Sequence, residues 1–260
     1  MRVTILGAGT AIPVKEHSPA GLYAEAGGEH LLFDAGPGTL QRLRQAGVSI
    51  FDLDRVFLTH YHLDHCLDLA SLLFALRIPR SDPDQRRGGP NPARMKPLAV
   101  YGPPGLKQLY RRLNHAFSGW LAPRSYPLWL KELKETTLKF RGAAVTSRWM
   151  RHSTQALGYR VEAGGRRMAY SGDTDVCENI VELGRNAHLL ILECSVTDER
   201  KTAGHLTPSE CGRIASAANC RHLVLTHFYP VFKGYDIRGR VRRTFGGRVS
   251  LARDLASFRV

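Results

Sequence analysis

The chain has 260 residues, of which 43% are hydrophobic and 23% are charged, a composition typical of globular proteins and not of disordered ones. Its 37 lysines and arginines exceed its 23 aspartates and glutamates, so the formal net charge is +14. That charge favours anionic partners such as phosphorylated compounds or nucleic acids, without identifying one. No apolar run is long enough to span a bilayer, so no transmembrane helix and no membrane partner are expected.

Cysteine content and the N-terminal segment both indicate a cytoplasmic protein. The cysteines form no CxxC pair and are odd in number, at Cys66, Cys177, Cys194, Cys211 and Cys220. We therefore expect no disulfide framework, and we expect these side chains to be small buried hydrophobic groups in a reducing compartment. The N-terminal apolar stretch "VTIL" meets glycine too soon to be a signal peptide.

The first quarter of the chain reads as strands followed by a helix. "VTILGAG" is a strand that ends in a glycine turn, and a dinucleotide-binding motif is excluded there because Ile12 and Pro13 stand where a third glycine and a helix are needed. "GLYAEAGGEHLLFDAG" predicts a hairpin that turns at Gly27–Gly28. "GTLQRLRQAG" predicts a helix that ends at Gly47.

A cluster of metal-capable side chains follows the next strand. "DRVFLTH" predicts a short buried strand, and leucines at Leu69, Leu72, Leu73 and Leu76 then follow a helical period. Between them, "HYHLDH" supplies His60, His62, Asp64 and His65. His60 and His62 are two residues apart, so in an extended segment both point to one side and can bind one ion. Asp64 and His65 can face a second ion once the chain turns into the helix.

The rest of the chain predicts further strands with interspersed helices. Residues 77–97 hold five prolines and six Lys/Arg, which predicts a mobile or extended basic loop. Residues 233–248 form a second basic segment, and either could contact a nucleic acid. Because no segment reads as an interdomain linker, we expect one α/β sandwich domain over residues 1–260.

Three more candidate ligands follow strand-like runs in the second half. They are His152 in "MRHST", Asp173 in "SGDTD" and His227 in "LTHFYP". Each alone would usually be a cap or a surface residue, but a common edge of the fold could gather them beside the first cluster. Imidazole and carboxylate are the ligand set expected for zinc, with manganese and iron as alternatives.

These motifs together resemble the metallo-β-lactamase fold and, within it, the ribonuclease Z-like branch of metal-dependent hydrolases. The resemblance rests on "GAGTAIP", "LLFDAGPGTL", "FLTHYHLDH", "AYSGDT", "GHLTPSE", "LVLTHFYP" and the terminal "VSLARDL". It implies a four-layer αββα sandwich, with two mixed sheets inside and helices on the outer faces. It also implies two divalent metal ions: His60, His62 and His152 on the first, Asp64, His65 and His227 on the second, and Asp173 bridging both.

The resemblance also implies two residues for the chemistry. His205 falls where the branch keeps a histidine that aids the leaving group, and Glu193 falls where it keeps a carboxylate partner. "TPSE" at 207–210 reads independently as a capping box with proline at the first helical position, which would hold His205 firmly. Two cations would lower the pKa of a shared water toward neutrality, and the resulting hydroxide would attack a phosphodiester. Asp64 would orient that water or take its proton.

One departure from the branch narrows the expected substrate. Members that process transfer RNA carry a long arm between the strands like "LGYRV" and "AYSGDT", whereas only "EAGGRRM" separates them here. We therefore expect a phosphodiesterase of nucleotides or RNA, and a true transfer RNA 3′ endoribonuclease is kept as an alternative only. A hydrolase of another ester or thioester is the alternative enzyme, and a basic nucleic-acid-binding protein with structural metals is the non-enzyme alternative. Dimers are common in the branch, so a homodimer is a further expectation.

Overall fold

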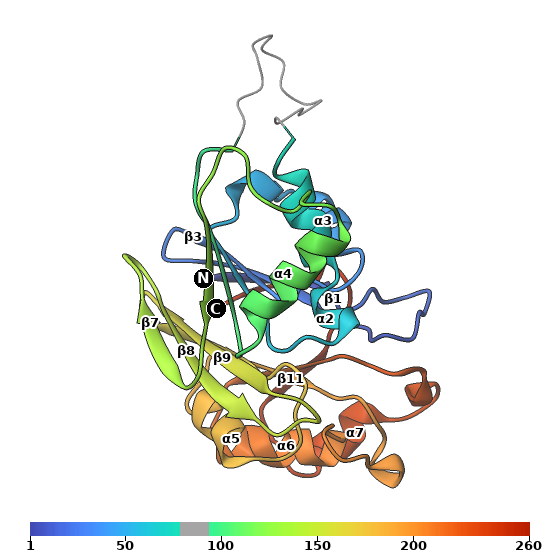
Figure 1. The fold of residues 1–260 in the computed structure, drawn as a ribbon. Helices are drawn as coiled ribbons and strands as arrows, with labels where there is room; N and C mark the ends of the chain where they lie inside the picture. The colour runs from blue at the N-terminus through green and yellow to red at the C-terminus, as the bar shows by residue number, and fades with distance from the viewer. Residues whose placement is uncertain (79–93) are drawn as a thin grey trace.

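The computed structural model describes residues 1–78 and 94–260, and within them two mixed β-sheets of seven strands lie face to face (Figure 1). The first sheet runs, from edge to edge, through β14 (Ser257–Arg259), β1 (Arg2–Gly7), β2 (Gly21–Ala26), β3 (Glu29–Phe33), β4 (Arg55–Phe57), β5 (Leu98–Gly102) and β6 (Leu128–Glu132). The second runs through β13 (Arg248–Leu251), β12 (His222–Thr226), β11 (Leu189–Glu193), β10 (Arg166–Tyr170), β9 (Ala156–Ala163), β8 (Ala144–Met150) and β7 (Thr136–Lys139).

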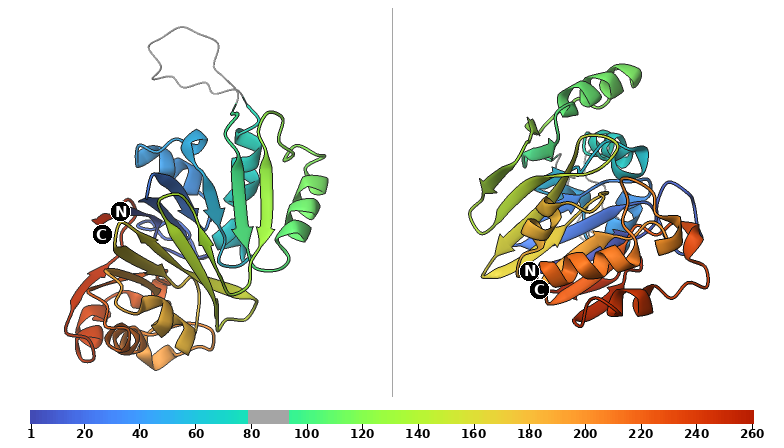
Figure 2. Two further views of the ribbon diagram at one scale, coloured as in Figure 1. Left: turned by 90° about the vertical axis from the view of Figure 1, so that its left-hand side faces the viewer. Right: turned by 90° about the horizontal axis from the view of Figure 1, so that it is seen from below.

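Helices cover the outer face of each sheet, so the predicted αββα sandwich is confirmed (Figures 1 and 2). On the first sheet lie α1 (Thr39–Gln45), α2 (Leu63–Cys66), α3 (Asp68–Ala75) and α4 (Leu106–Ala116), and on the second lie α5 (Glu178–Gly184), α6 (Pro208–Ala217) and α7 (Ile237–Arg242). Short 3₁₀ turns occupy Ile50–Asp52, Asp198–Arg200 and Pro230–Phe232. In the parts of the chain that the structure describes, no helix has the length and apolarity needed to cross a membrane.

The sandwich forms because its central strands are apolar on both faces. All five residues of β5 and of β11 are buried, as expected for parallel strands that have a sheet on one side and helices on the other. Between the sheets, the rings of Phe57 and Tyr101 stack at 4.7 Å, and Tyr159 of the opposite sheet meets Phe57 edge-on at 5.3 Å. Such aromatic pairs stabilise the fold beyond the effect of the apolar area that they bury, and their preferred geometries fix how the two sheets face each other.

Local predictions from the sequence are confirmed at several points. β2 pairs with β3 across Gly27–Gly28, whose φ angles of 59° and 81° are those that a tight hairpin turn requires. The leucine period after the histidine cluster forms α3. At the start of α6 the Thr207 side chain and Glu210 cap each other's backbone N–H groups, with Pro208 at the first helical position.

Most of the predicted basic loop, residues 79–93, lies outside the described residues, but both of its flanks are held to the protein. Arg77 donates to the carbonyl oxygens of Gly119 and Ala122 at 2.9 and 3.0 Å. Arg94 is 4% exposed and donates to the carbonyls of Phe51 and Leu53 at 2.6 and 2.7 Å. These two guanidinium groups hold the flanks in place and are not available to a nucleic acid.

Candidate metal centre

All of the predicted ligands lie at one edge of the sandwich, because the strands that carry them point the same way. β3 and β4 run parallel in the first sheet, and β10, β11 and β12 run parallel in the second. β8 shares the direction of β10, since both are antiparallel to β9. The loops at the carboxyl ends of these strands therefore converge, and this convergence gathers residues from positions 60 to 227.

The first donor group contains His60, His62, His152 and Asp173. His62 Nδ1 lies 3.0 Å from His60 Nε2 and 3.4 Å from His152 Nε2. Nitrogen ligands around a tetrahedral zinc ion, bound at about 2.0–2.1 Å, lie about 3.3 Å from one another. The three ring nitrogens are thus spaced as ligands of a common cation. His62 is exposed, so the group opens to solvent on one side.

The second donor group contains Asp64, His65 and His227. His65 Nε2 lies 3.1 Å from His227 Nε2, which lies 3.4 Å from an Asp64 oxygen. All three side chains are buried, with exposed fractions of 8%, 0% and 3% in the order given. The spacing again matches that of ligands around one ion, so the structure brings six of the predicted ligands together as two adjacent sets.

Asp173 lies between the two groups and turns one oxygen to each. Its Oδ1 is 3.3 Å from His65 Nε2 and 3.5 Å from His227 Nε2, while its Oδ2 is 3.9 Å from His60 Nε2 and 4.0 Å from His152 Nε2. Oδ1 is buried and has no hydrogen-bond partner among residues 1–78 and 94–260. A buried carboxylate oxygen without a donor is costly unless a cation satisfies it. The residues present therefore fit a pair of divalent ions that share this carboxylate.

Protonation states at the centre also favour bound cations. Burial, with the charge of His65 next, holds the pKa of His60 well below its usual value, and burial lowers that of His62. Both rings are thus neutral, the form that ligates metals. Burial also acts to lower the pKa of His65, but the nearby carboxylates of Asp173 and Asp34 outweigh it and raise that pKa well above normal. Without metal, the His65 ring is therefore protonated, and its positive charge partly offsets the negative charges of Asp173 and Asp34. A bound cation would supply positive charge at the same place.

Hydrogen bonds behind the ligands orient two of the rings in the first group. Thr59 Oγ1 lies 3.0 Å from His60 Nδ1, and the carbonyl oxygen of Gly204 lies 2.9 Å from His152 Nδ1. A bond at Nδ1 fixes the ring and directs Nε2 to the metal. No sequence motif marks these two partners.

The second group has equivalent partners, which were not among the predicted site residues. Asp34 Oδ2 lies 2.8 Å from His65 Nδ1, and Ser195 Oγ lies 3.0 Å from His227 Nδ1. Asp34 directly follows β3, just as His60 and Asp173 closely follow β4 and β10. Its place after a buried strand could therefore have predicted that it lies near the centre. Asp34 and His227 both have positive φ, 55° and 60°, a backbone region that non-glycine residues rarely occupy and that is enriched at functional sites.

Gly172 lets the loop that carries Asp173 come close to the opposite sheet. Its φ is 57°, and a Cβ atom there would lie 2.6 Å from Thr59 Cγ2. Only glycine fits both that conformation and that approach. The "SGD" sequence is therefore a requirement of packing as well as of ligation.

His205 and Glu193 form the predicted pair beside the donor groups. Glu193 is 1% exposed, and its Oε1 lies 3.0 Å from His205 Nδ1 and accepts from Thr174 N at 2.8 Å. Burial acts to lower the pKa of His205, but the hydrogen bond and charge of Glu193 outweigh it and raise that pKa. His205, Asp173 and His227 each have one potential ligand atom that lies within 4.8 Å of the other two. His205 therefore lies next to the two donor groups.

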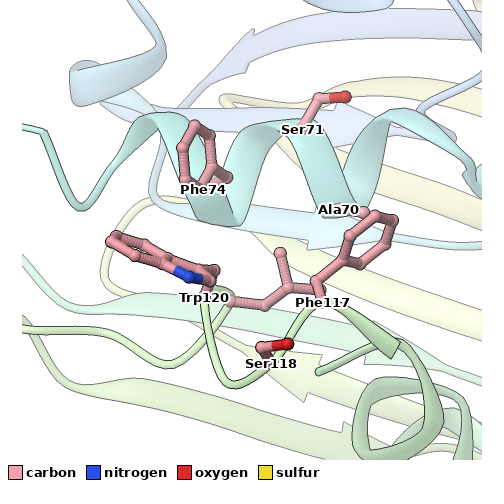
Figure 3. A pocket seen from close by; sticks show the side chains of 7 residues that line it. Ala70, Ser71, Phe74, Phe117, Ser118 and Trp120 are labelled. Carbon is pink, nitrogen blue, oxygen red and sulfur yellow. The ribbon is translucent and has the colours of Figure 1, made fainter. Parts of the chain in front are cut away.

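A separate apolar pocket of about 560 Å³ lies between α3 and the segment after α4 (Figure 3). Phe74, Phe117 and Trp120 line it, and the rings of Phe74 and Trp120 meet edge-on at 6.0 Å. Its lining holds no metal ligand and no acid or base among the described residues. The pocket is thus distinct from the centre and unsuited to hydrolysis.

Comparison with known proteins agrees with this geometry. The model of the beta-lactamase superfamily domain matches residues 29–228, a range that contains every predicted site residue. The chain belongs to this superfamily. A ribonuclease Z of Streptomyces coelicolor is 28% identical over 97% of this chain and 95% of its own length.

Two solved structures share the superfamily fold over nearly the whole chain. The metallo-β-lactamase fold protein YhfI from Bacillus subtilis has a TM-score of 0.82 at 24% identity and covers 99% of this chain and 98% of its own. The short form of human tRNase Z has a TM-score of 0.79 at 24% identity and covers 100% and 99%. Both similarities confirm the predicted fold.

Proposed function

We propose that this protein is a dinuclear metal-dependent phosphodiesterase that acts on RNA or nucleotide substrates. The observation that carries the proposal is the position of Asp173, whose two oxygens face two separate sets of ligands. Two-metal sites of this kind serve in-line displacement at phosphorus. Relatives named ribonuclease Z match along nearly their whole length, which supports RNA phosphodiesters as the substrate class.

In this proposal each set of ligands holds one ion. His60, His62 and His152 would hold the first, Asp64, His65 and His227 would hold the second, and Asp173 would contribute to both. Neutral imidazoles and carboxylates suit zinc, with manganese and iron as alternatives. When bound, the ions activate water near neutral pH and offset charge on the phosphoryl oxygens.

The remaining steps fall to side chains of the protein. His205, protonated and held by Glu193, donates a proton to the departing oxygen. Asp64, whose Oδ2 faces His227, orients the attacking water while it ligates. The basic surface attracts the anionic substrate.

The substrate is not expected to be a transfer RNA held by a protruding arm. In the structure β9 and β10 are joined by a tight turn at Gly164–Gly165, with φ angles of 56° and 71°. A turn of this length has no surface that could grip a second region of a folded RNA. Short or single-stranded phosphodiesters fit the proposal better.

Metal analysis combined with an activity assay tests the proposal. Protein purified without added metal should contain about two divalent ions per chain and should hydrolyse bis(4-nitrophenyl) phosphate. Chelation should abolish that turnover, and the metal found originally should restore it. Turnover of a glutathione thioester in place of the phosphodiester would favour the alternative ester or thioester hydrolase. RNA binding that survives Asp64→Ala, with no turnover of any ester, would favour a binding protein with structural metals.

Two expectations from the sequence complete the proposal. A homodimer is checked by light scattering of the purified protein, and a cytoplasmic location is checked by fractionation of cells that express it.

A further inference from the structure

A cavity of about 1140 Å³ adjoins the candidate metal centre. Three segments line it: the loop before β2, the segment from β12 into α7, and the connection from β13 to β14. Tyr229 belongs to its lining, and the Tyr229 ring centre lies 6.0 Å from that of His227 and 6.1 Å from that of His205. The cavity therefore begins where the proposed reaction takes place.

Three basic side chains of the cavity make no ion pair with the described residues, whereas two of its carboxylates accept hydrogen bonds from the protein. Lys233, Arg238 and Arg253 are exposed, and none has an ion pair within residues 1–78 and 94–260. By contrast, Asp254 accepts from Ala8 N and Ser18 N and pairs with an arginine of α1.

The second acid, Asp236, accepts from Gly239 N as the N-cap of α7. Glu16 is the remaining acid of the lining. Among the described residues the cavity thus offers three positive charges without an ion pair, whereas Glu16 and Asp236 keep their negative charges and Asp254 is paired with Arg42.

Tyr229 adds an aromatic surface at the entrance. It is half-buried, and its hydroxyl has no hydrogen bond to the described residues. A ring held by packing against two histidines and open on another side is a stacking platform for a base. Aromatic rings combined with a positively charged groove are the means by which proteins bind single-stranded nucleic acids without sequence preference.

We propose that this cavity binds the single strand that continues from the scissile phosphate, with one base stacked on Tyr229 and the following phosphates bound by Lys233, Arg238 and Arg253. This inference rests on the proposed phosphodiesterase function and narrows its substrate to single-stranded oligonucleotides. Compounds with one phosphodiester and no further phosphate would use the metal centre alone.

Binding of a non-cleavable strand tests the inference without requiring turnover. The probe is a fluorescent 2′-O-methyl oligonucleotide of about eight residues, titrated with the metal-loaded enzyme and followed by anisotropy. For single strands, each phosphate contact contributes about 0.7 to the slope of log affinity against log salt concentration. The variant K233A/R238A/R253A should therefore bind more weakly and should reduce that slope by about 2.

Tyr229 is tested by two substitutions that separate stacking from the hydroxyl group. Tyr229→Ala should weaken binding of the strand about 5- to 150-fold, while Tyr229→Phe should bind about as well as the unchanged protein. Arg166→Ala is the matched control, because Arg166 is exposed at the start of β10, the end of that strand opposite to the centre. It should alter neither the affinity nor the salt slope.

Possible outcomes distinguish this inference from the function on which it rests. An unchanged affinity and slope in the triple variant, or equal losses in the Arg166 control, would overturn the cavity assignment. Absence of turnover on both bis(4-nitrophenyl) phosphate and RNA by the unmodified, metal-loaded protein would overturn the phosphodiesterase proposal. If the cavity assignment and the phosphodiesterase proposal are both correct, the triple variant should lose activity on RNA more than on the small diester. The ratio of kcat/KM for RNA to kcat/KM for bis(4-nitrophenyl) phosphate should then fall at least tenfold.

Discussion

The carboxylate of Asp34 lies 2.8 Å from Nδ1 of His65, and both side chains are completely buried. The same carboxylate accepts hydrogen bonds from Thr59 N at 2.7 Å, from Thr59 Oγ1 at 3.0 Å and from Tyr170 OH at 2.9 Å. Asp34 therefore joins β3, β4 and β10 beneath the centre. It also holds a proton on Nδ1 of His65, so that Nε2 is the nitrogen that would bind a metal once its own proton is lost.

Replacement of Asp34 should weaken metal binding. Asp34→Asn keeps the size of the side chain but removes the charge that holds the Nδ1 proton of His65, and loss of such a partner typically costs about 10- to 100-fold in metal affinity. Competition with a chromogenic chelator measures this loss. Tyr170→Phe is the control, since it removes one donor to Asp34 and leaves the His65 contact intact. Equal affinity of Asp34→Asn and the unchanged protein would show that His65 needs no such orientation.

His205 should matter for turnover and not for metal content. Its ring faces the centre, but its Nδ1 is engaged by Glu193, and a general acid typically contributes about 10²- to 10⁴-fold to the rate. His205→Ala should lose turnover in this range while it retains both ions, as measured by metal analysis and steady-state kinetics on one preparation. A loss of one ion would instead make His205 a ligand, which its closeness to Asp173 and His227 allows geometrically.

Much of the fold and most of the centre could be predicted from the sequence, because both follow from local patterns. Apolar runs mark the central strands, and His60, Asp173 and His227 each come shortly after such a run. Parallel strands end at one edge of a sheet, so the sequence already places these side chains near one another. The hairpin at Gly27–Gly28 and the capping box at Thr207 are equally local, and both predictions are confirmed.

The partners behind the ligands could not be predicted, because they depend on tertiary contacts. The acceptor for His152 is a backbone carbonyl 52 positions away, and any residue type at position 204 would supply one. Ser195 meets His227 only because β11 and β12 lie side by side in register. The edge strand β6, "LWLKE", has half-buried and exposed residues but no buried one, so its place beside β5 follows from the sheet and not from a buried apolar run in its sequence.

Lys201 holds the loop that carries both His205 and the carbonyl of Gly204. Its ammonium group lies 2.6 Å from Asp175 Oδ1 and 2.8 Å from Glu210 Oε2, and it donates to the carbonyl of His205. Asp175 in turn accepts from Gly204 N at 3.0 Å. One side chain thus fixes the position of a catalytic candidate and of the acceptor that orients His152.

Loss of Lys201 should therefore lower kcat more than it changes KM. Lys201→Met keeps the length of the side chain but releases the loop, and a displacement of about 1 Å at a reacting group can cost about 10²-fold. Weaker binding of one of the two ions should accompany the loss, because the His152 ring is no longer fixed. Lys139→Met, at an exposed lysine of β7, is the control. Normal kcat in Lys201→Met would show that the loop holds its conformation without this ion cluster.

Asp254 connects the end of the chain to its beginning. Its two oxygens accept from Ala8 N at 3.0 Å and Ser18 N at 2.8 Å, and Arg42 lies 3.1 Å away. Burial acts to raise the pKa of Asp254, but the nearby His17 imidazole, 3.6 Å from Oδ1, and the hydrogen bonds from the Ser18 and Ala8 N–H groups outweigh it and lower that pKa below its usual value. The folded protein thus binds a proton at this carboxyl less readily than the unfolded chain does.

A lowered pKa in the folded state makes the contribution of Asp254 to stability dependent on pH in a defined direction. The contribution is complete above the pKa of the unfolded chain, about 3.9, and is lost as the pH falls through the lower pKa of the folded protein. Asp254→Asn should reduce the free energy of unfolding by about 1–3 kcal/mol at pH 7. Urea unfolding from pH 7 downward should show this difference shrinking only at acid pH. Asp236→Asn, at an exposed N-cap where asparagine caps as well as aspartate does, should show little difference at pH 7, and a difference for Asp254→Asn that grew on acidification would contradict the lowered pKa.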